Sequence, residues 1–244
     1  MDKLIKERGI IFNGEMVRAI LSGSKTQMRR VIKSPATTLQ NNGTNCIVYR
    51  EAGDPWYKDY VFSMRGHSGV WNDYTLPQFL ALCPFGQVGD RLWVRETFRV
   101  HSRATDVATI AYKASERQSW TQQVARVPIE LCTKQVSPEA WTPSIHMPRW
   151  ASRITLEITD IRVERLNDIS EADAINEGLI KEAYDWRSSE FPMANVAYRT
   201  YLESERRYSS PKQCYQSLWE SIYGQDSWQS NPFVWVVEFK RVEV

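Results

Sequence analysis

The stretch that determines the start of the fold covers residues 9–32 and reads GIIFNGEMVRAILSGSKTQMRRVI. Its apolar run at 9–12 predicts a strand, and the Asn-Gly pair after it is a turn signal. Apolar residues then recur at helical spacing over 15–21, and Gly23 stands where helices commonly end in glycine. The stretch therefore predicts a strand, a helix and a basic exit loop at 24–30.

The exit loop carries three basic residues beside two polar ones, namely Lys25, Thr26, Gln27, Arg29 and Arg30. Cations are favoured near a helix C-terminus by a few tenths of a kcal/mol, which accounts for one basic residue more readily than for three. The alternative is a contact with an anion or a base edge, in which Arg29 or Arg30 serves as a planar fork.

Four further segments have the pattern of strands. Residues 91–98 alternate between apolar and polar side chains, and 107–112 is a shorter candidate. The longest candidate, 150–165, changes phase near Asp160, which predicts a bulge or a sharp bend. The last, 233–242, is apolar on both faces and is therefore expected to be a central strand.

Loop-rich sequence separates these strands. We expect two insertions, at about 35–85 and 115–148, and a helical excursion at about 181–222 that ends in a helix over 215–222. Several strands with few helices predict an α+β fold, built as a small β-barrel with peripheral helices. The whole chain, 1–244, is expected to be one domain.

Composition narrows the classes of protein. The chain has 244 residues and a net charge of +2, so a nucleic-acid partner would require a concentrated basic patch. No apolar run is long enough for a membrane span, and a cytoplasmic location is expected. The four cysteines and three histidines are scattered, which predicts buried thiols, no metal site and no cofactor.

Arginine and tryptophan occur together twice. Arg91, Trp93 and Arg95 project to one side of their predicted strand. They form either a solvated face, with the ring packed over the arginine stems, or a stacking platform for a base with phosphate contacts. Arg149 and Trp150 repeat the theme just before the longest strand.

Glu96 falls on the other side of that strand, among apolar residues. A carboxylate in such a position must be paired if it is buried. Either Lys25 or Arg153 is a plausible partner. The helix predicted from Ser170, which begins with a capping-box-like pattern, ends near Glu177, an ordinary surface glutamate unless its context says otherwise.

These segments, taken in order, resemble the ASCH family of the PUA-like superfamily, in particular its longer members common in phages and prophages. The matching segments span nearly the whole chain between the insertions. They are ILSGSKT with Arg29-Arg30 at 20–30, CPFG at 83–86 with GDRLWVRE at 89–96, RWASR at 149–153, ISEADAINEG at 169–178 and NPFVW at 231–235.

The resemblance implies a compact β-barrel with a cleft beside the first helix, and binding of RNA or of modified nucleosides. A small bacterial branch of the family hydrolyses N4-acetylcytidine with a lysine, a threonine and a glutamate. The lysine corresponds to Lys25 and the glutamate to Glu177, but the threonine position is occupied by Met28. Thr26 is adjacent, yet neighbouring residues on an extended backbone point in opposite directions. Catalysis would require activation of a water molecule by Lys25 and Glu177, or a turn that repositions Thr26.

Three functions follow as hypotheses. The first is a non-catalytic reader of RNA, single-stranded nucleic acid or a modified nucleoside, with a base held near Trp93 or Trp150 and phosphates held by arginines such as Arg95 and Arg153. The second is a hydrolase, acting as an N4-acetylcytidine-type amidohydrolase or a ribonuclease. The third is a scaffold whose aromatic insertions bind a protein partner.

Overall fold

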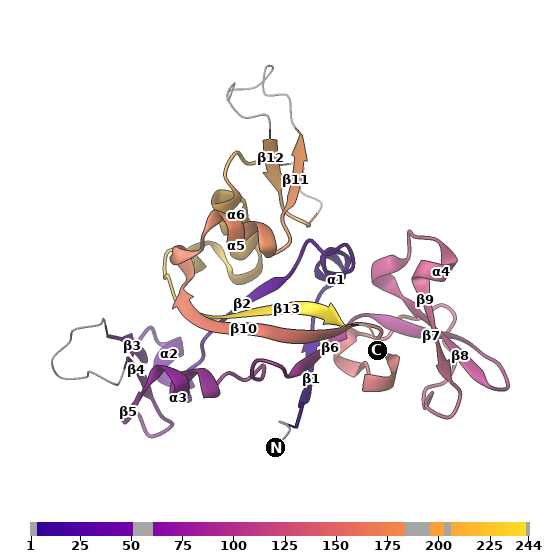
Figure 1. The fold of residues 1–244 in the computed structure, drawn as a ribbon, viewed down its shortest axis with the longest axis horizontal. Helices are drawn as coiled ribbons and strands as arrows, with labels where there is room; N and C mark the ends of the chain where they lie inside the picture. The colour runs from indigo at the N-terminus through magenta and orange to yellow at the C-terminus, as the bar shows by residue number, and fades with distance from the viewer. Residues whose placement is uncertain (1–3, 51–60, 184–195, 203–205, 243–244) are drawn as a thin grey trace.

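The computed structural model describes residues 4–50, 61–183, 196–202 and 206–242. Its centre is a five-stranded sheet in the order β1-β6-β10-β13-β2, and the long β10–β13 ribbon crosses the middle of the molecule (Figure 1). The strands are β1 (Glu7–Ile11), β6 (Arg91–Arg95), β10 (Thr155–Arg165), β13 (Phe233–Val242) and β2 (Gln27–Val31). Strands β1 and β6 are parallel and the other neighbours are antiparallel, so the sheet is mixed.

The long ribbon has the features that its sequence predicts. The register of β10 against β13 shifts between Ile158 and Asp160, which confirms the predicted bulge. Strand β13 is paired on both sides, with β10 and with β2, and is therefore central. The basic exit loop is shorter than predicted, because residues 27–31 form β2 against β13.

The predicted α+β class is confirmed, and the sheets are mixed or antiparallel. Among the described residues no ladder joins the two edge strands of the central sheet, β1 and β2, and no closed barrel is detected. Helix α1 (Gly14–Leu21) forms as predicted. The Asn13 side chain caps it by accepting a hydrogen bond of 2.8 Å from the Met16 amide.

The insertion at 35–85, which the sequence predicts to be loop-rich, is instead a folded unit of helices and strands. It contains α2 (Thr37–Asn41), β3 (Ile47–Tyr49), β4 (Phe62–Arg65), β5 (Trp71–Tyr74) and α3 (Leu76–Ala81). The three strands form an antiparallel sheet in the order β3-β4-β5, while residues 51–60 lie outside the described part. Aromatic packing attaches the unit to the central sheet. The Phe79 ring stacks on Phe62 at 4.3 Å and on Trp235 of β13 at 5.4 Å.

The second insertion, 115–148, contributes one strand to another small sheet. This sheet has the order β7-β8-β9, formed by β7 (Phe98–Arg103), β8 (Val107–Tyr112) and β9 (Val124–Pro128), with α4 (Trp120–Gln123) beside it. The sheet has its own hydrophobic cluster around Phe98, Ile110 and Met147. Short 3-10 helices occur at Lys113–Ser115, Ser144–His146, Arg149–Ala151, Leu166–Asp168 and Gln225–Ser227.

The segment predicted as a helical excursion, 181–222, begins instead as a hairpin of β11 (Ile180–Ala183) and β12 (Val196–Arg199). Its residues 184–195 and 203–205 lie outside the described part. The helix predicted at 215–222 is confirmed as α6 (Pro211–Tyr223), which lies beside α5 (Glu171–Asn176) (Figure 1).

All four cysteines are buried and free, as predicted. No helix in the described ranges combines the length and apolar character that crossing a membrane requires.

The contact between the 35–85 unit and the central sheet can be tested at Phe79, whose side chain is fully buried. We expect Phe79→Ala to lower the free energy of unfolding by about 3–5 kcal/mol, because it removes the ring between two aromatic partners. Urea denaturation followed by fluorescence measures this change. The matched control, Leu76→Ala on the exposed side of the same helix, should cost less than about 1 kcal/mol. Equal losses in the two variants would contradict the docked arrangement.

Candidate functional site

Lys25 and Glu177, which are 152 residues apart in sequence, meet in the fold. The Lys25 Nζ donates to the Glu177 carboxylate Oε2 at 2.7 Å and to the Glu177 backbone carbonyl at 2.9 Å. Both residues are buried, with 3% and 4% of their surface exposed. The two backbones form an isolated β-bridge, and the Thr26 amide donates to the Asn176 carbonyl at 2.9 Å. The site therefore lies where the end of α5 meets the start of β2.

Local features of α5 place the glutamate. Ser170 caps the helix by accepting a hydrogen bond of 3.0 Å from the Asp173 amide, which confirms the predicted start. The helix ends at Asn176, Glu177 is its C-cap residue, and Gly178 follows with a φ of +101°. A side chain at Gly178 would place its Cβ only 3.1 Å from the Lys25 Cβ. Glycine is thus needed here both for the backbone conformation and for the close approach of Lys25.

Arg29 completes a buried ionic network. Its guanidinium contacts Glu177 at 3.0 Å, Glu164 of β10 at 2.7 Å and Asp173 at 3.3 Å. Lys25, Gln27 and Arg29 are buried at alternate positions, as expected for residues on one side of an extended backbone. Arg29 is therefore committed to protein carboxylates, and the fork predicted for an external anion is in use within the fold.

Burial dominates the electrostatics of the lysine. Desolvation lowers the pKa of Lys25, and the neighbouring Glu177 carboxylate opposes that shift. An ammonium group has three donors, and two of them are used in the contacts with Glu177. The third donor has no hydrogen-bond partner among the described residues, and Lys25 lines the small pocket beside it.

That pocket is small, and aromatic and aliphatic side chains form most of its lining. Its volume is about 20 Å³, enough for roughly one water molecule. The described residues that line it are Phe12, Met16, Lys25, Met28, Arg29, Arg30, Glu177, Tyr201, Tyr215, Leu218, Trp219, Ile222 and Tyr223. None of them is a serine, threonine or cysteine. Thr26 is exposed and is not part of the lining, in agreement with the expectation that it points away from Lys25.

Sequence reasoning missed the aromatic wall. Tyr215, Trp219 and Tyr223 recur at every fourth position of α6, and Tyr201 adds a fourth ring. Burial raises the pKa of Tyr215 far above its usual range. The four-residue spacing was a detectable signal, but it is the same spacing that any buried helix face shows.

The other predicted residues lie elsewhere. Arg153 forms two hydrogen bonds with the buried Glu96, at 2.9 and 3.0 Å, so the partner of Glu96 is Arg153 and not Lys25. The same guanidinium lies 4.0 Å from the centre of the Tyr112 ring, and burial raises the pKa of Glu96 despite this pairing. The pair links the end of β6 to the β7-β8-β9 sheet.

The arginine and tryptophan pairs are also held within the protein. Arg95 lies over the Trp93 ring at 5.5 Å and donates to the Ile145 carbonyl. Arg149 pairs with Glu7 at 2.9 Å. The Trp150 ring packs partly buried against the cluster of the second sheet. None of these residues is among the described lining of the Lys25 pocket.

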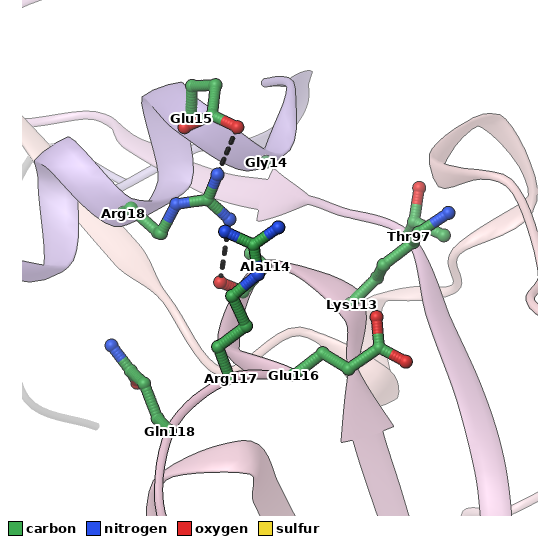
Figure 2. Close-up of a pocket in the computed structure, with 9 residues that line it drawn as sticks. All are labelled: Gly14, Glu15, Arg18, Thr97, Lys113, Ala114, Glu116, Arg117 and Gln118. Carbon is green, nitrogen blue, oxygen red and sulfur yellow. Dashed lines mark hydrogen bonds and ion pairs between the residues drawn. The ribbon is translucent and has the colours of Figure 1, made fainter. Parts of the chain in front are cut away.

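A larger pocket, of about 600 Å³, opens beside α1 (Figure 2). Figure 2 shows its mixed charges, with Arg18 bonded to Glu15 and to the Ala114 carbonyl, and Lys113 and Glu116 nearby. Neither Lys25 nor Glu177 lines it. Of the predicted site residues, Lys25, Arg29, Arg30 and Glu177 line the small pocket, and none lines this one.

The stability of the ionic network can be tested by removing one charge and then two. We expect Lys25→Met to lower the free energy of unfolding by about 3 kcal/mol, because Glu177 loses a buried partner. The double variant Lys25→Met, Glu177→Gln should recover part of that loss, since the uncompensated carboxylate is gone while Arg29 keeps Glu164 and Asp173. Urea denaturation of the parent, of Lys25→Met, of Glu177→Gln and of the double variant gives the coupling, and additive losses would contradict a direct ion pair.

Asp173 predicts how stability depends on pH. Desolvation acts to raise its pKa, but the hydrogen bond from Gln27 and the charges of Arg162 and Arg29 outweigh it and hold the pKa below the ordinary value of 3.8. The stabilisation is therefore present above pH 3.8 and is lost as the pH falls through the lower, folded-state pKa.

We accordingly expect Asp173→Asn to be less stable than the parent at neutral pH, with a difference that shrinks below about pH 4. Denaturation midpoints measured from pH 7 to pH 3 test this. Asp106→Asn, at an exposed position, is the control and should follow the parent across the range. A constant difference between Asp173→Asn and the parent down to pH 3 would rule out the predicted linkage.

Comparison with known proteins gives no relative whose function could be compared with this site. No protein-family model, no curated protein and no solved structure matches this chain. Within the described ranges, no group of three or more His, Cys, Asp or Glu residues could hold a metal ion. The resemblance to ASCH proteins rests on the ordered motifs alone.

Proposed function

We propose that this chain is an ASCH-type, PUA-like protein that binds a nucleobase, free or within a strand, at the Lys25 pocket. One observation carries the proposal. A buried lysine with an unused donor lies against a carboxylate on the floor of a pocket walled by aromatic rings. Binding sites of this kind combine apolar walls with a few polar groups that fix orientation.

The chemistry of the floor fits the edge of a base. Lys25 offers a donor, and the Glu177 carboxylate has lone pairs beyond those that accept from Lys25 and Arg29. The hydrogen-bonding edges of the nucleobases present neighbouring donors and acceptors, and carboxylates accept from exocyclic amines such as N4 of cytosine. The rings of Tyr201, Trp219 and Tyr223 supply surfaces for stacking.

Binding requires the pocket to widen. Its volume of about 20 Å³ is far below that of a base. Ile222 and Tyr223, at the end of α6, are 43% and 40% exposed, so this end of the wall borders solvent. We place the entrance there, with movement of the helix end or of Tyr201 admitting the base.

The PUA-like assignment belongs to the same proposal. Its support is the order of five motifs and the meeting of the lysine and glutamate that the resemblance pairs, at 2.7 Å. A barrel of the family type is the finer expectation for the central sheet, and its edges β1 and β2 are the strands that would have to approach each other.

Hydrolysis is the second candidate, favoured by the lowered pKa of Lys25 beside a carboxylate. Among the described lining residues there is no serine, threonine or cysteine, so the reaction would use water as its nucleophile. The pocket takes roughly one water molecule. Without a covalent nucleophile, we rank binding above turnover.

Calorimetric titration with adenosine, cytidine, guanosine, uridine and N4-acetylcytidine tests the proposal. We expect at least one nucleoside to bind and Lys25→Met to weaken that binding by roughly tenfold or more, because a hydrogen bond from a charged donor is lost. Lys181→Met, at an exposed position, is the matched control and should bind as the parent does.

Circular dichroism verifies that each variant is folded before titration. Chromatography of the N4-acetylcytidine mixture then separates the two candidates. Release of cytidine would establish the hydrolase and displace the binding proposal. Failure of all five nucleosides to bind the folded parent would overturn the proposal at this site.

A further inference from the structure

A third pocket, larger than the Lys25 pocket, lies where the 35–85 unit meets the central sheet. Its volume is about 670 Å³, within the range of small-molecule sites. The residues that line it come from β2, from the 35–85 unit, from α6 and from β13. They are Arg30, Val31, Ile32, Lys33, Pro35, Met64, Tyr74, Leu82, Pro84, Phe85, Tyr223 and Trp235.

The lining combines aromatic walls with positive charge. Tyr74, Phe85 and Trp235 provide rings, and Arg30 and Lys33 are the charged members. No acidic side chain is among the described residues of this lining. The pocket is mostly apolar, and the only charged residues in its described lining are basic. Such a pocket favours a ligand that joins a flat apolar group to an anion.

Arg30 is available for such an anion. The adjacent Arg29 is paired with three carboxylates, whereas Arg30 makes only long hydrogen bonds of 3.4 Å, to the Tyr223 hydroxyl and to the Ile11 carbonyl. It forms no ion pair with any carboxylate of the described part. Lys33 is exposed.

The two pockets are neighbours. Arg30 and Tyr223 line the Lys25 pocket as well as the larger one. A group held by Arg30 therefore lies between the floor at Lys25 and the aromatic hollow of the 35–85 unit. In a nucleic-acid strand, a phosphodiester group likewise lies between the two nucleotides whose bases would occupy the two pockets.

We propose that the larger pocket is a subsite for a second nucleotide of a single strand. The adjacent base occupies the aromatic hollow, and Arg30 and Lys33 contact the phosphate that links it to the base at Lys25. This inference rests on the proposed function, and it specifies the ligand as a strand of at least two nucleotides. Arginine contacts to phosphate and stacking of bases on aromatic rings supply the interactions.

The test compares the nucleosides adenosine, cytidine, guanosine and uridine with the dinucleotides ApA, CpC, GpG and UpU by calorimetric titration. We expect the dinucleotide of the bound base to bind roughly tenfold more tightly than its nucleoside, as one added stacked base provides. Leu82→Trp, at a 43% exposed position of the lining, fills the hollow and should remove that gain without changing nucleoside binding.

Lys33→Gln should remove part of the same gain, whereas Arg126→Gln, at an exposed arginine outside both pockets, should not. An equal loss in Arg126→Gln would reduce the effect to general charge attraction and overturn the subsite. Nucleoside binding with no gain for the dinucleotide would overturn the subsite and leave the proposed function standing. Failure of both ligand series, together with failure of N4-acetylcytidine to bind, would overturn both proposals. Dinucleotide binding that Leu82→Trp abolishes and Lys25→Met leaves unchanged would place the ligand in the larger pocket alone, and would overturn both the base site at Lys25 and the subsite that depends on it.

Discussion

The buried ionic network of Lys25, Arg29 and Glu177 is the interaction on which the site depends. It joins the start of β2 to the end of α5, and Arg29 extends it to Glu164 on β10. Charges taken out of water are tolerated only where they are paired and hydrogen bonded, so each member restricts where the others can lie. The position of α5 against the central sheet and the orientation of the lysine therefore have the same cause.

The same network explains how charged side chains are held in the lining of an otherwise mostly apolar pocket. Glu177 shares its two oxygens between Lys25 and Arg29, which fixes the carboxylate without using all its accepting capacity. The α6 rings line this pocket and leave room for roughly one water molecule, and the low polarity of such surroundings strengthens each polar contact within it. Because the pocket is so small, a ligand larger than a water molecule could enter only if some of the lining side chains moved.

The 35–85 unit packs beside β2 and β13 and forms a pocket there with residues of both strands. It is attached through Phe79 to Trp235 of β13, so its sheet is part of the packed protein. This attachment creates the large hollow beside Arg30, in which Trp235 and Phe85 face a cationic lining. Arg29 and Arg30 are adjacent in sequence, yet one stabilises the fold and the other lines both pockets, because their partners come from different elements.

Local patterns were sufficient to predict much of the central sheet. Apolar alternation predicted β6, the phase change near Asp160 predicted the bulge of β10, and a serine cap predicted the start of α5. The 35–85 sheet and the β11–β12 hairpin were not predicted, because their short strands are stabilised mainly by packing between distant segments.

For the candidate site too, some features could be predicted from the sequence and others only from the tertiary structure. The sequence by itself determined that a lysine follows the first helix and that a glutamate lies at the end of the capped helix, whereas the expectation of a nucleophile at Met28 came only from the resemblance. The ASCH resemblance paired the lysine with the glutamate. Only the tertiary structure decided that Arg29 joins them, that Glu96 pairs with Arg153 and that α6 covers the pocket. Helix caps and strand alternation depend on near neighbours, whereas ion pairs and pocket walls depend on contacts between residues far apart in the chain.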